Sequence, residues 1–124
     1  MQVFSICKVK IKMEAEEFVK KIRDRVIQKD HEIYEEILNT KEDVKDSIWK
    51  ESIAIYRGLS DNQKKSFLIL LRLMQVNTLS HIFGILDGSS YLSGEKEIFL
   101  LLEKKSNNIL NGDLQDIFLE IEED

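Results

Sequence analysis

Apolar and polar positions follow a helical period over most of the chain, and the densest apolar pattern lies between Ser60 and Gly88. Ser60 and Gln63 have the spacing of a capping box, Asp61 places a negative charge in the first helical turn, and Gly88 suits the position after a helix end. This pattern predicts a helix over about residues 61–87. Its apolar residues nearly encircle a helical wheel, so we expect neighbours to cover the helix on several sides.

Two amphipathic helices are predicted before this segment. The first runs from Met13 to about Leu38, with a glutamate-rich first turn and an apolar stripe along one side. Thr40, followed three residues later by Asp43, is the expected cap of a second helix over about residues 41–57. In this second helix we expect Val44, Ile48 and Ile55 to form a buried face. Trp49, Ile53 and Tyr56 are expected to lie beside that face. The short link to the next helix predicts an antiparallel hairpin.

After Gly88 the pattern changes to a loop and then to the short apolar run 98–102, which fits either a strand or a helix. A strand there needs a partner, and two segments qualify: Ile109-Leu110, or residues 3–11, whose apolar residues alternate with lysines. The alternative for residues 1–12 is a poorly ordered extension. A last helix is predicted from the i, i+3, i+4, i+7 spacing of Leu114, Ile117, Phe118 and Ile121.

These elements predict a mostly α fold: a small helical bundle around a central buried helix, formed by residues 1–124 as a single domain. A minor β-hairpin would make the fold α+β, which is the alternative. The composition agrees with this fold, because 43% of the 124 residues are hydrophobic and 33% are charged, as in ordinary globular proteins. The chain has no proline and only five glycines, which favours helices over a loop-rich sandwich.

The net charge and the cysteine content indicate which cellular compartment and which class of partner to expect. The net charge is −5, which repels phosphate backbones and argues against nucleic-acid binding. The single Cys7 cannot form an internal disulfide, and the N-terminal lysines follow the apolar residues, the reverse of a secretory signal. The longest unbroken apolar run in the predicted central helix has five residues, far fewer than the ~20 that a bilayer requires. We therefore expect a cytoplasmic protein with no membrane span.

The most suggestive polar residues lie on the central helix. Asn77 and His81 are four residues apart and share a helical face, with Ser66, Ser80 and Gly84 nearby. One interpretation is a ligand pocket between helices, in which His81 and Asn77 act together with Tyr91. The other is a core histidine that is hydrogen-bonded within a tight helix crossing, where the small side chains let another helix approach.

The acidic C-terminus suggests a different role. Its last twelve residues carry six acidic side chains and no basic one, so a surface containing Glu120, Glu122 and Glu123 would attract a basic protein partner. A plain solvated face is the structural alternative. We interpret the chain first as a non-enzymatic intracellular interaction protein of the immunity, antitoxin or adaptor type; homo-oligomerisation through an exposed helix face is compatible with this interpretation and with the next. The second interpretation is a small enzyme or ligand-binding protein that uses the pocket near His81.

Motifs of cofactor and metal chemistry are missing from the sequence. There is no phosphate-binding glycine loop, no paired cysteine motif and no nucleophile elbow, so we assign no catalytic residue, metal or cofactor. His31 and Glu35 are one helical turn apart, but the zinc-protease spacing requires a second histidine where Glu35 stands. We interpret them as a solvated pair.

Overall fold

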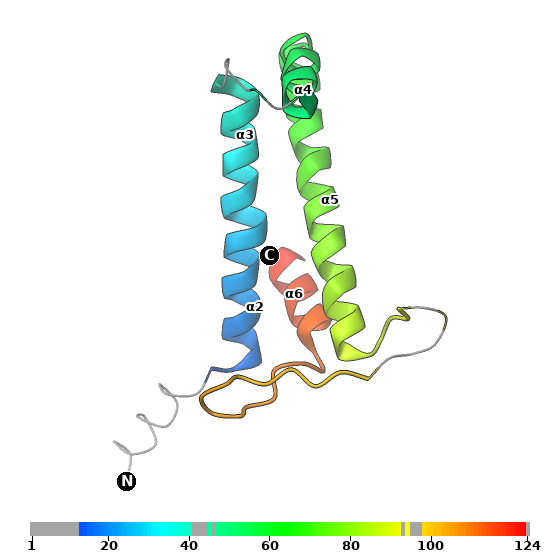
Figure 1. Ribbon diagram of the computed structural model, residues 1–124. Helices are drawn as coiled ribbons and strands as arrows, with labels where there is room; N and C mark the ends of the chain where they lie inside the picture. The colour runs from blue at the N-terminus through cyan, green and yellow to red at the C-terminus, as the bar shows by residue number, and fades with distance from the viewer. Residues whose placement is uncertain (1–12, 41–44, 46, 93, 95–97, 124) are drawn as a thin grey trace. The chain divides into compact units, whose positions relative to one another are not determined.

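The computed structural model describes residues 13–40, 45, 47–92, 94 and 98–123, and these residues are mostly helical (Figure 1). The mostly α fold class is confirmed. The helical elements are α2 (Ala15–Arg23), a π-helical stretch η1 (Asp24–Lys29), α3 (Asp30–Thr40), α4 (Ser47–Arg57), α5 (Asp61–Asp87) and α6 (Leu114–Glu123). The expected strand and extension at the N-terminus lie outside the described residues.

By its internal contacts the chain divides into two compact units. In the described part, the first unit contains residues 13–23 and 77–123, and the second contains residues 24–76. The helical stretch from α2 to α3 therefore contributes residues to both units, and so does α5.

In the first unit α2 packs against α6, and the last part of α5 joins them. The rings of Phe83 on α5 and Phe118 on α6 meet edge to face with their centroids 5.6 Å apart, a favourable aromatic geometry. Burial of apolar surface is the main stabilising term, and the buried apolar side chains of this unit are Val19, Leu79, Phe83, Leu110, Leu114 and Phe118.

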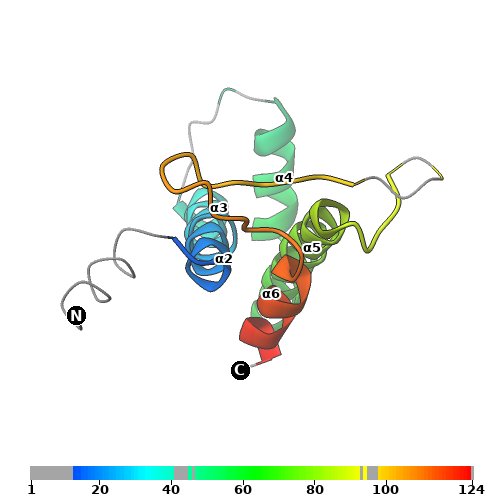
Figure 2. The same ribbon diagram turned by 90° about the horizontal axis from the view of Figure 1, so that it is seen from below.

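Residues 98–110 of the first unit are extended rather than helical, and they double back on themselves near the start of α2 (Figure 2). A single antiparallel bridge joins Leu102 to Ile109, and the Leu110 amide donates to the Leu101 carbonyl over 2.8 Å. Of the two partners considered for the apolar run, Ile109-Leu110 is therefore the one found. The pairing is too short to form a strand among the described residues, so the fold stays in the α class.

In the second unit α3 packs against α4 around a small apolar cluster. Leu38, Ile53 and Tyr56 are its buried members, and partly buried side chains surround them: Ile37, Trp49, Leu59 and Leu68. The Trp49 ring lies 6.0 Å from the Tyr34 ring of α3, measured between centroids. The aromatic residues of the second predicted helix are therefore core residues of this unit.

Two predictions for this unit were wrong. Thr40 does not cap the next helix: it is the last residue of α3, and its hydroxyl donates to the Glu36 carbonyl one turn back. Ile48 and Ile55 are not buried, because α4 turns its Ile53 face toward the cluster and leaves Ile48 75% exposed. The residue expected to complete the Thr40 capping box, at position 43, lies outside the described residues.

The helix α5 begins and ends where the sequence predicts, but it is not buried along its whole length. Its buried residues are confined to the C-terminal part: Leu79, Ser80, Phe83 and Gly84. The apolar residues nearer its start are largely exposed, Ile69 by 69% and Leu70 by 53%. The expectation of cover on several sides is therefore wrong: α5 is buried along one side in the first unit, where Ile82 is still 47% exposed, and it is largely exposed in the second.

Candidate interaction site

In the first unit, the end of α5 is tied to the start of α6 by one carboxylate. Asp87 accepts hydrogen bonds from the backbone amides of Gly112, Leu114 and Gln115, at 2.7, 3.1 and 2.9 Å. Amides in the first turn of a helix lack partners within the helix, and the positive end of the helix dipole favours an anion there. Asp87 therefore caps α6 from another helix.

A second contact in this unit depends on small side chains. The Gln115 amide group donates to the Ser80 carbonyl at 3.0 Å and to the Ser80 hydroxyl at 3.1 Å. A Cβ atom added to Gly84 would lie 2.7 Å from the Ser90 hydroxyl and 3.0 Å from the Gln115 side chain. The prediction that Ser80 and Gly84 permit a close approach is confirmed, and the residue that approaches is Gln115.

Asn111 completes this polar junction. Its amide group donates to the carbonyls of Leu86 and Phe99, at 2.6 and 2.7 Å, and its oxygen accepts from the Leu101 amide at 2.8 Å. In the described part of the chain every buried side-chain nitrogen and oxygen has a hydrogen-bond partner. Such a satisfied network holds α5, the extended segment and α6 together, and its function is structural.

The residues proposed for a ligand pocket lie on the surface. Asn77 and His81 are exposed side chains of α5, and Tyr91 is 66% exposed in the loop that follows. Both interpretations of His81 placed it inside the bundle, either in a pocket or in a helix crossing, and its exposure fits neither placement. His81 is therefore available to solvent rather than enclosed by a cavity.

The three glutamates proposed for partner binding differ in environment. Glu120 and Glu123 are exposed on α6. Glu122 instead forms an ion pair with Arg23 of α2, with 2.7 Å between the guanidinium Nε and the carboxylate Oε1. The two side chains are only 21% and 14% exposed, so the charge of Glu122 is largely neutralised within the unit.

In the second unit, one side of α5 makes polar contacts with η1 and α3. Arg72 donates to the Gln28 side chain at 2.7 Å, and the Gln75 amide nitrogen donates to the Val26 carbonyl at 3.1 Å. That donation orients the Gln75 amide, so its oxygen faces the Nδ1 atom of His31, 3.1 Å away. The described partner of His31 is therefore Gln75 rather than the expected Glu35.

The opposite side of α5 in this unit is apolar and exposed. We call it the α5 outer face and define it by five residues of one contiguous arc of about 160° on a helical wheel: Phe67, Ile69, Leu70, Leu73 and Met74. Their exposed fractions, from 36% to 69%, correspond to roughly 400 Å² of apolar surface, within the range of the largest patches on monomeric proteins, which are often functional. In this unit α5 therefore has apolar side chains on two sides: Leu68 packs inward against the apolar cluster, and the outer face stays exposed.

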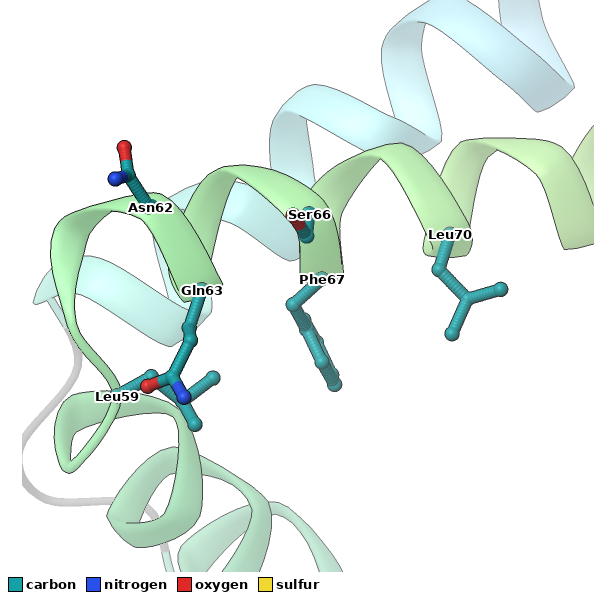
Figure 3. A pocket seen from close by; sticks show the side chains of 6 residues that line it. All are labelled: Leu59, Asn62, Gln63, Ser66, Phe67 and Leu70. Atoms are coloured by element: carbon teal, nitrogen blue, oxygen red, sulfur yellow. The ribbon is translucent and has the colours of Figure 1, made fainter.

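A shallow hollow of about 380 Å³ lies at the start of this face (Figure 3). Its lining is mainly apolar and comes from the end of the α4–α5 connection and the first turns of α5: Leu59, Asn62, Gln63, Ser66, Phe67 and Leu70. Gln63, Phe67 and Leu70 project from the same side of α5 in Figure 3. The Phe67 ring also lies against the Tyr56 ring of α4, 5.7 Å between centroids, which holds one wall in place. The hollow is open to solvent.

By length and composition alone, α5 is also long and apolar enough to cross a membrane, and 22% of its most apolar 18-residue stretch is buried. Its polar contacts argue against a span. Arg72 and Gln75 lie near the middle of the helix, and they bond to η1 and α3, which carry several charged side chains. A charged side chain at the centre of a bilayer costs about 2.5–3.5 kcal/mol, and the bonded helix would add further charges at the same depth.

The sequence placed Phe67, Leu70 and Met74 of the outer face in a helix expected to be covered on several sides, whereas Ile69 and Leu73 were not singled out. The sequence signal was the even spread of apolar residues around α5. A helix that leaves one apolar face exposed to solvent has the same spread. The described residues contain no group of three or more histidine, cysteine, aspartate or glutamate side chains placed to hold a metal ion. No family model, curated protein or solved structure matches the chain.

Proposed function

We propose that this chain is a non-enzymatic interaction protein whose contact surface is the α5 outer face. The observation that supports the proposal is an apolar face that stays exposed in the second unit, although Leu68 is already packed inward by the same helix, α5. Its polar residues Arg72 and Gln75 bond inward to η1, while Leu70 and its neighbours face solvent. An exposed apolar patch of this kind is costly in water, and each 100 Å² that a partner covers contributes about 2.5 kcal/mol. Binding of a partner would remove this apolar surface from water.

The proposed partner is a protein rather than a small molecule. The hollow beside Phe67 is open, whereas small-molecule sites enclose most of the ligand surface. Exposed apolar helix faces typically accept the apolar face of another helix. An adaptor-, immunity- or antitoxin-type protein of the cytoplasm remains our proposal for the biological class.

A photo-crosslinking amino acid at position 70, in cells that make the protein naturally, tests this function. The expected result is a crosslink to a polypeptide, and Ile48 on α4 provides the matched control because it is also apolar and exposed. Equal crosslinking at positions 48 and 70 would indicate non-specific contact. Absence of any protein crosslink at position 70, or crosslinking to lipid alone, would contradict the proposal.

A second candidate surface is the exposed acidic face of α6. The helix has no basic residue, and because Arg23 neutralises Glu122, the carboxylates that stay exposed are those of Asp116, Glu120 and Glu123. A basic partner would bind such a face with a strong dependence on salt. Reversing the charge at Glu120 and Glu123 together would then weaken binding and reduce that dependence, whereas unchanged affinity would rule this face out.

A further inference from the structure

We infer that residues 3–11, which precede the described part of the chain, pair as a parallel strand with the open edge of the extended run 98–102. The inference is independent of the α5 outer face, since it concerns the first unit. Exposure along the run alternates as in a strand with one solvated face. Ile98 and Leu100 are 91% and 66% exposed, whereas Phe99 between them is 40% exposed and Leu101 is half-buried.

The hydrogen bonds around this run show which of its edges is open. The bridge from Leu102 to Ile109 lies between two backbone hydrogen bonds, of 2.9 and 2.8 Å, that the flanking residues form. In such a pair the N–H and C=O groups of each bridged residue point away from its partner. Those of Leu102, and of Leu100 two residues earlier, therefore point to the opposite edge. No hydrogen bond among the described residues reaches them.

An open edge with exposed apolar side chains readily pairs with another strand, and folded proteins usually cover such an edge. The described part of the chain begins close to this one. The Met13 amide donates to the Glu103 carboxylate at 3.4 Å, and the Asn108 side chain donates to the Met13 carbonyl at 2.6 Å. Residues 3–11 therefore lead to the same turn, 103–108, that the run 98–102 enters.

This location selects residues 3–11 as the occupant and fixes their direction. Nine extended residues reach about 30 Å, roughly twice the length of the five-residue run. Both segments run toward the same turn, so a pair along the edge is parallel. A segment attached this close has an effective concentration in the millimolar range, which a second copy or another protein rarely reaches in solution.

The sequence of the segment sets the register. Val9 and Ile11 alternate with lysines, the pattern of a half-buried strand. Neighbouring apolar side chains on paired strands stabilise a sheet. The register that brings such side chains together places Ile11 beside Leu102 and Val9 beside Leu100.

Amide hydrogen exchange of the full chain, measured by NMR, tests whether the edge is covered. We expect the amides of Leu100 and Leu102 to exchange at least about tenfold more slowly than the amide of Ile109. Ile109 is the internal control, because its N–H group faces the far edge of the same bridge.

A proline in the segment tests which residues cover the edge. In the proposed register the Lys10 amide donates to the Leu100 carbonyl, so Lys10→Pro should remove the protection of Leu100 and Leu102. Gln2→Pro, outside the paired residues, is the matched control and should leave the protection unchanged. The Leu110 amide, which donates within the first unit, should stay protected in both variants and so verifies their fold.

The register has its own readout in Cys7, the single cysteine of the chain. It lies beside Ile98 in the proposed pair, and neighbouring residues of paired strands are about 4.8 Å apart, within the range of disulfide Cα separations. Mild oxidation of Ile98→Cys at about 10 µM should therefore form a disulfide within one chain. Ile109→Cys, also apolar and exposed in the native chain, is the matched control and should form it at least about tenfold more slowly.

Leu100 and Leu102 amides that exchange as fast as the Ile109 amide would overturn the pairing. Protection that persists in Lys10→Pro would mean that another segment or molecule covers the edge. A disulfide between two chains would mean that the segment comes from a second copy, and either result refutes pairing within one chain. Absence of the disulfide at position 98, or equal formation at positions 98 and 109, would refute the register.

Discussion

The Arg23 guanidinium and the Glu122 carboxylate lie 2.7 Å apart and join α2 to α6 across 99 positions of the chain. Both side chains are mostly buried, so neither charge can be fully hydrated if its partner is removed. We therefore expect Glu122→Ala to lower the free energy of unfolding by about 2 kcal/mol. Urea denaturation measures the change.

Glu120→Ala is the control for this pair, because Glu120 is exposed on the same helix and should change stability by less than about 0.5 kcal/mol. In a double-mutant cycle with Arg23→Ala, the two losses should be clearly less than additive. Additive losses would mean that the ion pair contributes nothing of its own.

Asp87 should be the most important single cap in the first unit. Asp87→Ala removes an acceptor from three backbone amides at the start of α6 and should cost about 2–3 kcal/mol. Asp116→Ala, an exposed acid in the first turn of the same helix, should cost less than about 0.5 kcal/mol. Thermal unfolding of both variants compares them, and equal melting temperatures would refute the capping role.

Gly84→Ala tests the close approach of Gln115. In an open helix this substitution stabilises by about 1 kcal/mol, but here the new Cβ would lie 2.7 Å from the Ser90 hydroxyl. We expect a loss of about 1–3 kcal/mol in urea denaturation. Gly58→Ala is the control, because its Cβ would meet only ordinary contacts, the nearest 3.5 Å away. Stabilisation by Gly84→Ala would show that the space is larger than the structure indicates.

We expect the stability of the first unit to depend on pH through the ionisation of Glu103. Its pKa is lowered from 4.5 chiefly by the hydrogen bond from the Ser106 hydroxyl, aided by the Met13 amide and nearby lysines, against a smaller opposing effect of desolvation. A lowered pKa in the folded state means that ionised Glu103 stabilises the fold above about pH 4.5. This stability is lost as the pH falls from that value through the folded-state pKa. Glu103→Gln should flatten this acidic limb in urea denaturations from neutral to acidic pH, and an unchanged limb would contradict the assignment.

The ends of α5 and the presence of α6 were predicted correctly from local signals, whereas the equally local cap predicted at Thr40 was wrong. The reciprocal bonds of the Ser60–Gln63 capping box are present at 2.9 and 3.2 Å, and Gly88 after the helix end has a φ of +79°. The i, i+3, i+4, i+7 spacing of apolar residues near the C-terminus likewise predicted the helix α6. These features depend on residues three or four positions apart, so the amino-acid order alone contains them.

The site could be predicted only in part, because a periodic pattern does not say what a helix faces. Periodicity placed Ile48, Leu70 and His81 on helices, yet all three are exposed. Glu122 looked like a free surface charge until Arg23, far away in the chain, was seen beside it.

The sequence by itself therefore determined the helical class, the bounds of α5 and the existence of α6, since backbone hydrogen bonding and capping are local. Only the tertiary structure decided that Asp87 caps a helix that begins 27 residues away and that α5 leaves an apolar face exposed in the second unit. The physical reason is that burial and capping across elements depend on which segments meet. That choice is made by the sum of many packing contacts rather than by any short stretch of residues.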